Sequence, residues 1–329
     1  MNPARTRPVL TALNAAPGLL LLLVLAAFTA ATPRFLEPRN LVNILVQSSS
    51  TGIVAVGMTF VLLTAGVDLS VGALMFVAAA VAGKMVLAGF PLGLALGAIV
   101  LIGLAGGCLN AFFITRLRVA AFIVTLATLY LGRGLALWIT QTRALNLPDS
   151  FLALGTTRLA GVPLPVLLFA GTVALAHLVL TRTPYGRQIH AVGQDADAAR
   201  KAGLPAQQII ASVYVISGLG AALGGIVALS QLGAVSPTFG TNKEFGAIAA
   251  AVLGGTSLFG GRGRVFPGTV LGTVLIQTVE NGLVVVNADP YLYPLITSGI
   301  IFLAVLIDCT RTRLLAQSRR RRVRPEESL

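Results

Sequence analysis

Long runs of hydrophobic residues without any charge dominate the chain. Four of them cover residues 40–67, 85–115, 159–181 and 202–242. Each run is long enough for a helix that crosses a hydrocarbon core of roughly 30 Å. The pattern therefore predicts an all-α, polytopic helical membrane protein, with at least one span in each run.

Ten spans can be drawn from this pattern, all within one transmembrane domain over residues 1–310. They run approximately over 16–32, 43–65, 70–89, 93–114, 119–139, 163–181, 208–231, 244–258, 266–286 and 292–308. The second span carries Gly52 and Gly57, and the eighth runs into a glycine-dense segment, so either is a candidate for a broken or re-entrant helix. Small residues at 26–31 resemble a signal-peptidase site, but the later sequence is also apolar, so we interpret the first span as an uncleaved signal anchor.

Composition supports the membrane assignment, and charge gives it an orientation. Hydrophobic residues make up 56% of the chain, charged residues 11%, and the mean hydropathy is +0.87. A water-soluble domain could not hide so much apolar surface. In the ten-span scheme, 17 of the 24 basic residues fall on the side of the termini and 5 on the other. Cytoplasmic segments carry the excess of Lys and Arg, so both termini are predicted to be cytoplasmic.

The net charge of +13 needs no nucleic-acid partner under this scheme. We interpret the basic tail, 311–329, as a topology signal that touches anionic lipid rather than as a nucleic-acid patch. The five basic residues on the opposite side are Arg34, Arg39, Arg143, Arg158 and Lys243, while Lys84 and Arg133 fall inside spans.

The turn from Gly66 to Gly72 places a carboxylate between two predicted spans. A charge in such a place costs free energy unless it has partners. Asp68 or Ser70 can cap a helix that begins near Val71, which would be a structural role. The turn can instead gate or line a path through the membrane, although the spacing alone favours the structural interpretation.

The loop after the sixth span is the most polar internal segment. Pro184 and Gly186 are expected to end the preceding helix. Asp195 or Asp197 can cap a short helix that runs to Lys201. Such a helix would offer a compact docking surface, and an ordinary solvated connector is an equal alternative.

Motifs for catalysis or metal binding are missing from the sequence. A P-loop needs Gly-Lys-Ser/Thr, but the sole Gly-Lys pair, Gly83-Lys84, is followed by methionine. No HExxH, CxxC or Gly-x-Ser-x-Gly motif occurs, and we interpret His177 and His190 as a packed polar residue and a surface residue. We therefore expect no catalytic residue, no metal site and no ATP hydrolysis by this chain.

Several spaced motifs, in order along almost the whole chain, resemble those of the permease subunits of ribose/galactose/xylose-type ATP-binding-cassette importers. They are Ala55 to Thr59 with Thr64 to Gly72, Ala121 to Leu126 with Arg133-Gly134, Thr183 to Gly203, Ala247 to Gly261, and Asn281 to Leu283. The chain departs from the family pattern at Phe245-Gly246, where the family usually has a Leu-Asp pair after the glutamate.

The resemblance implies a helical permease of about ten spans in the bacterial inner membrane, paired with a second copy or a close relative. A separate cytoplasmic ATPase would hold ATP and magnesium, so this chain would bind no cofactor. A periplasmic sugar-binding protein would deliver a monosaccharide and supply the specificity. Which sugar is carried, and whether the pair is a homodimer, do not follow from the sequence.

The resemblance also implies two groups of functional residues. Alternating access would be driven through a coupling loop at about 182–205, with Thr183, Pro184, Tyr185, Gly186, Arg187, Asp195, Ala199 and Gly203. The translocation path or gate would include Asp68, Ser70, Phe122, Thr125, Glu244 and Asn281.

Two other classes of function compete with this interpretation. A proton-coupled carrier would titrate Asp68 or Glu280 and need no ATPase. A membrane scaffold or sensor would carry no substrate at all.

Overall fold

The computed structural model describes residues 3–289, 291–293, 295–296, 298–300, 302–303, 305–306 and 309, with the backbone alone for 3–16. The tenth predicted span is therefore described only in parts, and the basic tail, 311–329, lies outside the described residues. The elements in chain order are α1 (Pro3–Ala31), η1 (Pro33–Leu36), α2 (Pro38–Leu63), α3 (Val71–Leu87), α4 (Leu92–Thr115), α5 (Ala121–Thr140), β1 (Leu145–Asn146), α6 (Asp149–Thr156), β2 (Arg158–Leu159), β3 (Val162–Pro163), α7 (Leu164–Arg182), α8 (Pro184–Gln194), α9 (Ala196–Lys201), α10 (Ala206–Leu232), β4 (Ala234–Val235), α11 (Lys243–Leu253), the π-helical turn η2 (Val265–Thr269) and α12 (Val270–Val285).

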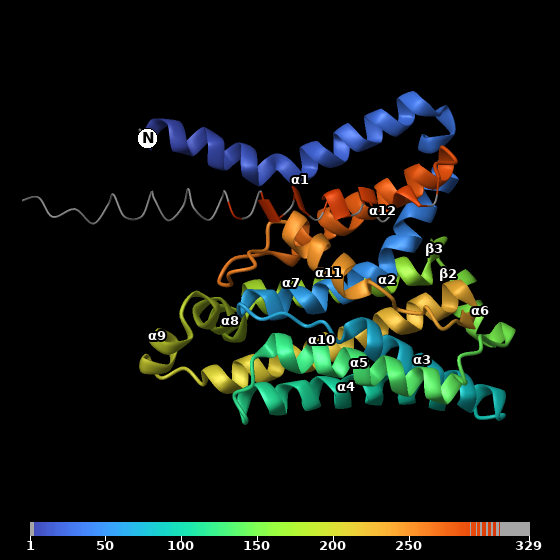
Figure 1. The fold of residues 1–329 in the computed structure, drawn as a ribbon. Helices are drawn as coiled ribbons and strands as arrows, with labels where there is room; N and C mark the ends of the chain where they lie inside the picture. Colours follow the sequence, from blue (N-terminus) through green and yellow to red (C-terminus); the bar gives the residue numbers. More distant parts are fainter. Residues whose placement is uncertain are drawn as a thin grey trace, which may run out of the picture.

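The long helices form a bundle with two distinct ends (Figure 1). Six described helices are long and apolar enough to cross a membrane, namely α2, α4, α5, α7, α10 and the η2–α12 segment, which is kinked at Phe266. The last half of α1 and the whole of α3 are shorter apolar helices. The prediction of a polytopic helical membrane protein is confirmed. Helices α8 and α9 lie at one end, and α6 with the β2–β3 hairpin lies at the other; we call these the α8–α9 end and the α6 end.

Glycines bring the central helices into close contact. The prediction that the second span is broken is wrong, because α2 runs as one helix from Pro38 to Leu63. A Cβ at Gly57 would lie 3.2 Å from the Cα of Ser217, so the glycine lets α2 approach α10. On α4, Gly107 faces the α10 backbone in the same way. Small residues serve this purpose in membrane helices generally.

Helices α3 and α11 both begin in the interior of the bundle (Figure 1). A non-helical segment, 64–70, leads from the end of α2 to α3, and a segment rich in turns, 236–242, leads inward to α11. The two helix starts meet, because a Cβ at Gly72 would overlap the Gly240 carbonyl oxygen. The predicted span 70–89 corresponds closely to α3, which has 17 residues, whereas the helix in the predicted span 244–258 is α11, which has only 11 residues and ends at Leu253.

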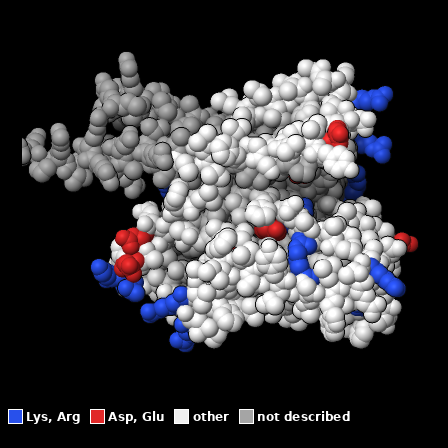
Figure 2. Space-filling model, in the orientation of Figure 1, with Lys and Arg blue, Asp and Glu red and all other residues white. Residues whose placement is uncertain are grey.

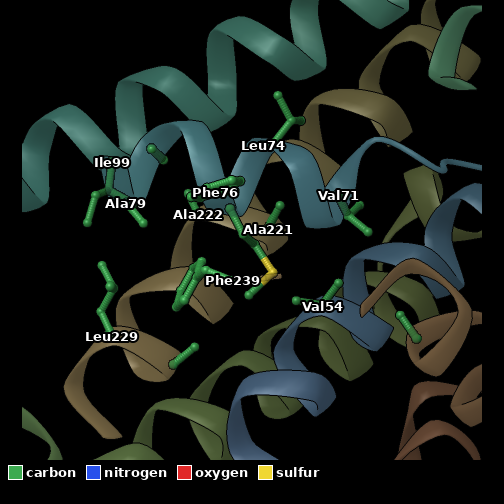
Figure 3. Close-up of a cluster of buried hydrophobic side chains, with 14 of the residues drawn as sticks. Val54, Val71, Leu74, Phe76, Ala79, Ile99, Ala221, Ala222, Leu229 and Phe239 are labelled. Carbon is green, nitrogen blue, oxygen red and sulfur yellow. The ribbon is translucent and has the colours of Figure 1, made fainter. Parts of the chain in front are cut away.

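Helix α3 forms the centre of the larger apolar core. It is buried almost all round, from Val71 to Ala80 and again at Ala82 and Gly83, as expected for a helix that is apolar on every face. Figure 3 shows its Leu74 and Phe76 among side chains of α2, α4 and α10, with Phe239 from the approach to α11. The core therefore holds the start of α3 in place.

Helix α1 packs on the outside of the bundle against α12. The Phe28 ring fills the space beside Gly282, where a Cβ would overlap it. The same ring lies 5.2 Å from the Phe35 ring, between centroids, and Phe35 is fully buried. This aromatic pair fixes the turn from α1 into α2.

Candidate functional site

A chain of buried hydrogen bonds surrounds the Asp68 carboxylate. Thr128 on α5 donates to Asn110 Oδ1 at 2.7 Å, and Asn110 Nδ2 on α4 donates to Ser70 Oγ at 2.8 Å. Ser70 Oγ then donates to Asp68 Oδ1 at 2.6 Å, and the Ser70 N–H donates to the same oxygen at 2.9 Å. Hydrogen bonds arranged head to tail polarise one another, so the chain stabilises a charge on Asp68.

The Asp68 turn has further partners from α5 and α10. Thr125 is fully buried and its hydroxyl lies 3.5 Å from the Val67 carbonyl oxygen, at the limit of a hydrogen bond. Ser217 on α10 lies near the Asp68 side chain, but its hydroxyl makes no hydrogen bond within the described residues, and the Tyr214 hydroxyl approaches the same Val67 carbonyl. Helix α3 begins at Val71 as predicted, but its N-cap Ser70 makes no side-chain cap, because its hydroxyl is turned to Asp68.

Glu244 lies at the start of α11, opposite the Asp68 turn. It is 3% exposed, and a Cβ at Gly72 would overlap its Oε2. Electrostatic interactions link it to Arg133 on α5 and to Asp68. Two carboxylates, one from each helix start, therefore share the interior with one arginine.

A second polar cluster joins α2, α11 and α12. Lys243 Nζ donates to Thr51 Oγ1 at 2.9 Å and interacts with the charge of Glu280. Gln277 Nε2 donates to Gln47 Oε1 at 3.0 Å. Glu280 on α12 therefore interacts with a charged residue of another helix, α11.

The coupling loop folds into two short helices. Thr183 caps α8 by accepting from the Gly186 N–H at 3.2 Å, and Asp195 caps α9 by accepting from two N–H groups at 3.0 and 2.9 Å. The Asp195 cap and the end of α9 at Lys201 are as predicted, whereas Pro184 and Gly186 start α8 instead of only ending α7. Gly186 packs on the Leu180 carbonyl.

Side chains of α8 and α9 anchor the loop to the bundle. Ile189 and Ala199 are buried in the second apolar core. The Tyr185 hydroxyl hydrogen-bonds the Ser212 hydroxyl of α10, and burial raises the pKa of the Tyr185 phenol. Arg187 is exposed, and Gly203 makes the turn after α9 with a positive φ of 85°. The loop is therefore anchored to the bundle by its buried side chains and exposes the charge of Arg187 on its surface.

The end of α8 touches the backbone at the end of α2. A Cβ at Gly193 would overlap the Leu63 carbonyl oxygen, and that oxygen accepts from the Gly261 N–H at 2.9 Å. His190 Nδ1 lies 3.3 Å from the Gly261 carbonyl oxygen. His190 is therefore a contact residue rather than only a surface residue. Leu63 immediately precedes the non-helical segment that carries Asp68.

The structure gathers only part of the predicted path. Asp68, Ser70, Thr125 and Glu244 lie together. Phe122 lies one turn before Thr125 with 57% of its surface exposed. Asn281 is buried on α12, and its Oδ1 has no described partner. We find both outside the hydrogen-bond chain around Asp68.

Several members of the site were missed by sequence reasoning. Asn110 and Thr128 lie in apolar helices, and their only sequence signal was a polar residue within a span. Ser217 looked like an ordinary small residue. Within the described residues, no three His, Cys, Asp or Glu side chains come close enough to hold a metal ion.

The position of Gly246 bears on the Phe245-Gly246 departure. A Cβ at Gly246 would meet only Thr51 Cγ2, at 3.8 Å. The space beside α11 could therefore accept the aspartate that the resembled family carries. Phe245 is 48% exposed, so the larger ring occupies an outer face of α11.

Comparison with known proteins gives a consistent result over nearly the whole chain. The family model described as branched-chain amino acid transport system / permease component matches residues 40–307. The ribose import permease proteins of Haemophilus influenzae and Bacillus subtilis are 36% and 38% identical, each over 88% of this chain and 90% of their own length. The D-allose transport system permease protein of Escherichia coli is 35% identical over 88% of this chain and 89% of its own. No solved structure matches the chain.

Proposed function

The chain belongs to the family of transport-system permease components, and on that premise we propose that it is the membrane-spanning subunit of an ATP-binding-cassette importer for a monosaccharide. The names of the similar permeases refer to ribose, allose and xylose, which supports a pentose or hexose as substrate. ATP and magnesium belong to a partner ATPase in this proposal. A periplasmic binding protein delivers the sugar, and a second permease completes the pathway.

The proposed orientation puts the α8–α9 end in the cytoplasm. Ten crossings result if α3 and α11, with the non-helical segments that lead to them, each count as one and the segment 292–308 as the last. Basic residues near the α8–α9 end support this orientation through the positive-inside rule. They include Arg116, Arg118, Arg182, Arg187, Arg200 and Lys201. The ATPase then docks on α8 and α9, and the binding protein approaches the α6 end.

The junction of α3 and α11 is the proposed gate. Asp68 and Glu244 line it from its two sides, and both are buried, at 0% and 3% exposure, so this arrangement is closed. Discontinuous helices that start in the membrane interior are a common way to build a transport site. Sugar hydroxyls would meet the carboxylates and Thr125 only after the two helix starts separate.

The observation that carries the proposal is the contact of Gly193 with Leu63. Through it, a movement of α8 acts on the end of α2, and the segment 64–70 transmits the movement to the start of α3. The Leu63 carbonyl also holds Gly261, so the chain that follows α11 moves with it. Packed interfaces shift between discrete arrangements rather than deform continuously.

A glycine substitution tests this route. We expect Gly193→Ala, in the assembled transporter in proteoliposomes, to lower ATP-driven sugar uptake at least tenfold, because the new methyl group pushes α8 off the α2 backbone. Gly171→Ala on α7, where a Cβ meets nothing within 4 Å, is the matched control and should transport normally. Both variants are checked for membrane yield and for co-purification with the ATPase.

Should Gly193→Ala reduce the yield, Asp195→Lys provides a second variant at an exposed position. It removes the α9 cap and should leave ATP hydrolysis in place while sugar uptake falls. Wild-type uptake by both variants would contradict the coupling route. Uptake that persists without ATP and collapses with an uncoupler would contradict the importer itself and favour a proton-coupled carrier.

A further inference from the structure

Three arginines gather around one hollow at the α6 end. Arg34, Arg39 and Arg158 line a hollow of about 650 Å³, together with Glu37 and residues of α2, α6 and α12. Figure 2 shows basic side chains along this edge of the molecule, with acidic side chains on the same edge. These are three of the five basic residues that the charge scheme assigns to the periplasmic side. We call this site the arginine hollow.

The positive charges of the arginine hollow are not neutralised within the described chain. Glu37 is the one carboxylate among the lining residues, and no described ion pair joins it to an arginine. Arg158 reaches only the Gly161 carbonyl, at 3.5 Å. Arg39 and Arg158 are far apart in sequence, so the fold itself brings the like charges together. Such a cluster costs free energy unless an anion offsets it.

Apolar side chains share the walls of the arginine hollow with the polar side chains of Asn40, Asn43 and Thr156. The apolar part consists of Val42 and Val46 of α2, Val285 of α12 and Pro163 of the hairpin. Val46 lies seven residues after Arg39 on α2, so the lining reaches about 10 Å below the arginine. Cations at the mouth above an apolar wall match the shape of a phospholipid, whose phosphate lies above its acyl chains.

We propose that the arginine hollow binds the phosphodiester headgroup of an anionic phospholipid from the periplasmic leaflet. This inference rests on the proposed orientation, which puts the α6 end at the periplasmic surface. Guanidinium groups bind phosphate oxygens in a bidentate manner, and one such pair engages both non-bridging oxygens of a phosphodiester. An acidic side chain of a docking protein would engage the arginines but leave Val42, Val46 and Val285 uncovered. Bound lipid would fasten the start of α2 to the β2–β3 hairpin.

Photolabelling of the whole chain tests the proposal. The probe is phosphatidylglycerol with a photoreactive group on one acyl chain, incorporated into phosphatidylcholine vesicles that hold the full-length protein. Peptide mass spectrometry then locates the adducts, which separates this site from the basic residues at the other end. We expect adducts within 36–46 and 155–163, and at least a fivefold loss in the triple variant Arg34→Gln, Arg39→Gln, Arg158→Gln.

Arg143→Gln is the matched control, because Arg143 is exposed, is assigned to the same side and does not line the hollow. It should leave the labelling unchanged, as should excess inorganic phosphate if an intact lipid is bound. Equal labelling by photoreactive phosphatidylcholine, or unchanged labelling of the triple variant, would overturn the proposal. Loss of the labelling when inorganic phosphate is added in excess would overturn it as well. So would a triple variant whose lipid labelling is unchanged and which loses only its affinity for a periplasmic protein. The assay needs neither ATP nor sugar, so its result is separable from failure of the transport proposal.

Discussion

The starts of α3 and α11 meet at the same point but are held differently. The start of α3 is fixed by the hydrogen-bond chain from Asp68 through Ser70 to α4 and α5, and apolar residues bury α3 on every side. The start of α11 has Lys243 bonded to Thr51, while Glu244 Oε2 has no described hydrogen-bond partner. Phe245 leaves one face of α11 open. The comparison indicates that the start of α3 is fixed and that the start of α11 is freer to move. We call them the fixed half and the freer half of the junction.

The contact between the two starts gives the largest expected effect. Gly72→Val should overlap the Gly240 carbonyl and the Glu244 side chain, and strained packing of this kind costs about 1–3 kcal/mol or more. We expect a lower unfolding temperature in detergent and no transport. Gly134→Val on α5, where a Cβ meets nothing within 4 Å, is the control for valine in a helix. Equal stability of the two variants would mean that the helix starts do not meet tightly.

Removal of the Asp68 carboxylate should weaken the fixed half. Asp68→Ala leaves the Ser70 hydroxyl and N–H without their acceptor in a buried place, which costs about 1–3 kcal/mol for an unsatisfied group. We expect reduced thermal stability together with reduced uptake. Ser236→Ala, at an exposed hydroxyl pair, should leave both unchanged. A stable and active Asp68→Ala variant would contradict the anchoring role of the hydrogen-bond chain.

The smallest effect on stability is expected in the freer half. Glu244→Gln keeps the shape of the side chain and removes its charge, so the free energy of unfolding should change by less than about 1 kcal/mol. Uptake should nevertheless fall several-fold, because the junction loses its electrostatic balance with Arg133. Asp149→Asn at the start of α6 is the control. A loss of stability as large as that of Asp68→Ala would remove the difference between the two halves.

Sequence patterns were sufficient for the long helices and for the polar loop. Hydropathy placed α4, α7 and α10 within a few residues, because a span of apolar side chains is a local property. The Asp195 cap could be predicted for the same reason, because it depends only on the next few residues of the chain. Hydropathy also gave the bounds of α3 to within two residues, but it extended α11 past Leu253. It measures the nature of side chains and does not report the depth at which a helix begins. The close contact of Gly72 with Gly240 joins residues far apart in sequence, and no local pattern reports it.

The same reason explains which site residues were found. Asp68 and Glu244 were recognised as carboxylates near apolar segments and through family resemblance. Asn110 and Thr128 were missed, because their importance comes from a bond across two helices. The arginine hollow was missed likewise, since Arg39 and Arg158 converge only through the fold. The structure therefore adds the contacts between residues that lie on different helices and far apart in the sequence.

The docking of Phe28 beside Gly282 has a consequence for biosynthesis. The two residues are about 250 positions apart, so at roughly 5–20 residues per second the ribosome delivers Gly282 on the order of 10–50 s after Phe28. Helix α1 enters the membrane first yet finds its partner only when α12 has been made. During that interval its aromatic side chain is available to lipids and to membrane chaperones.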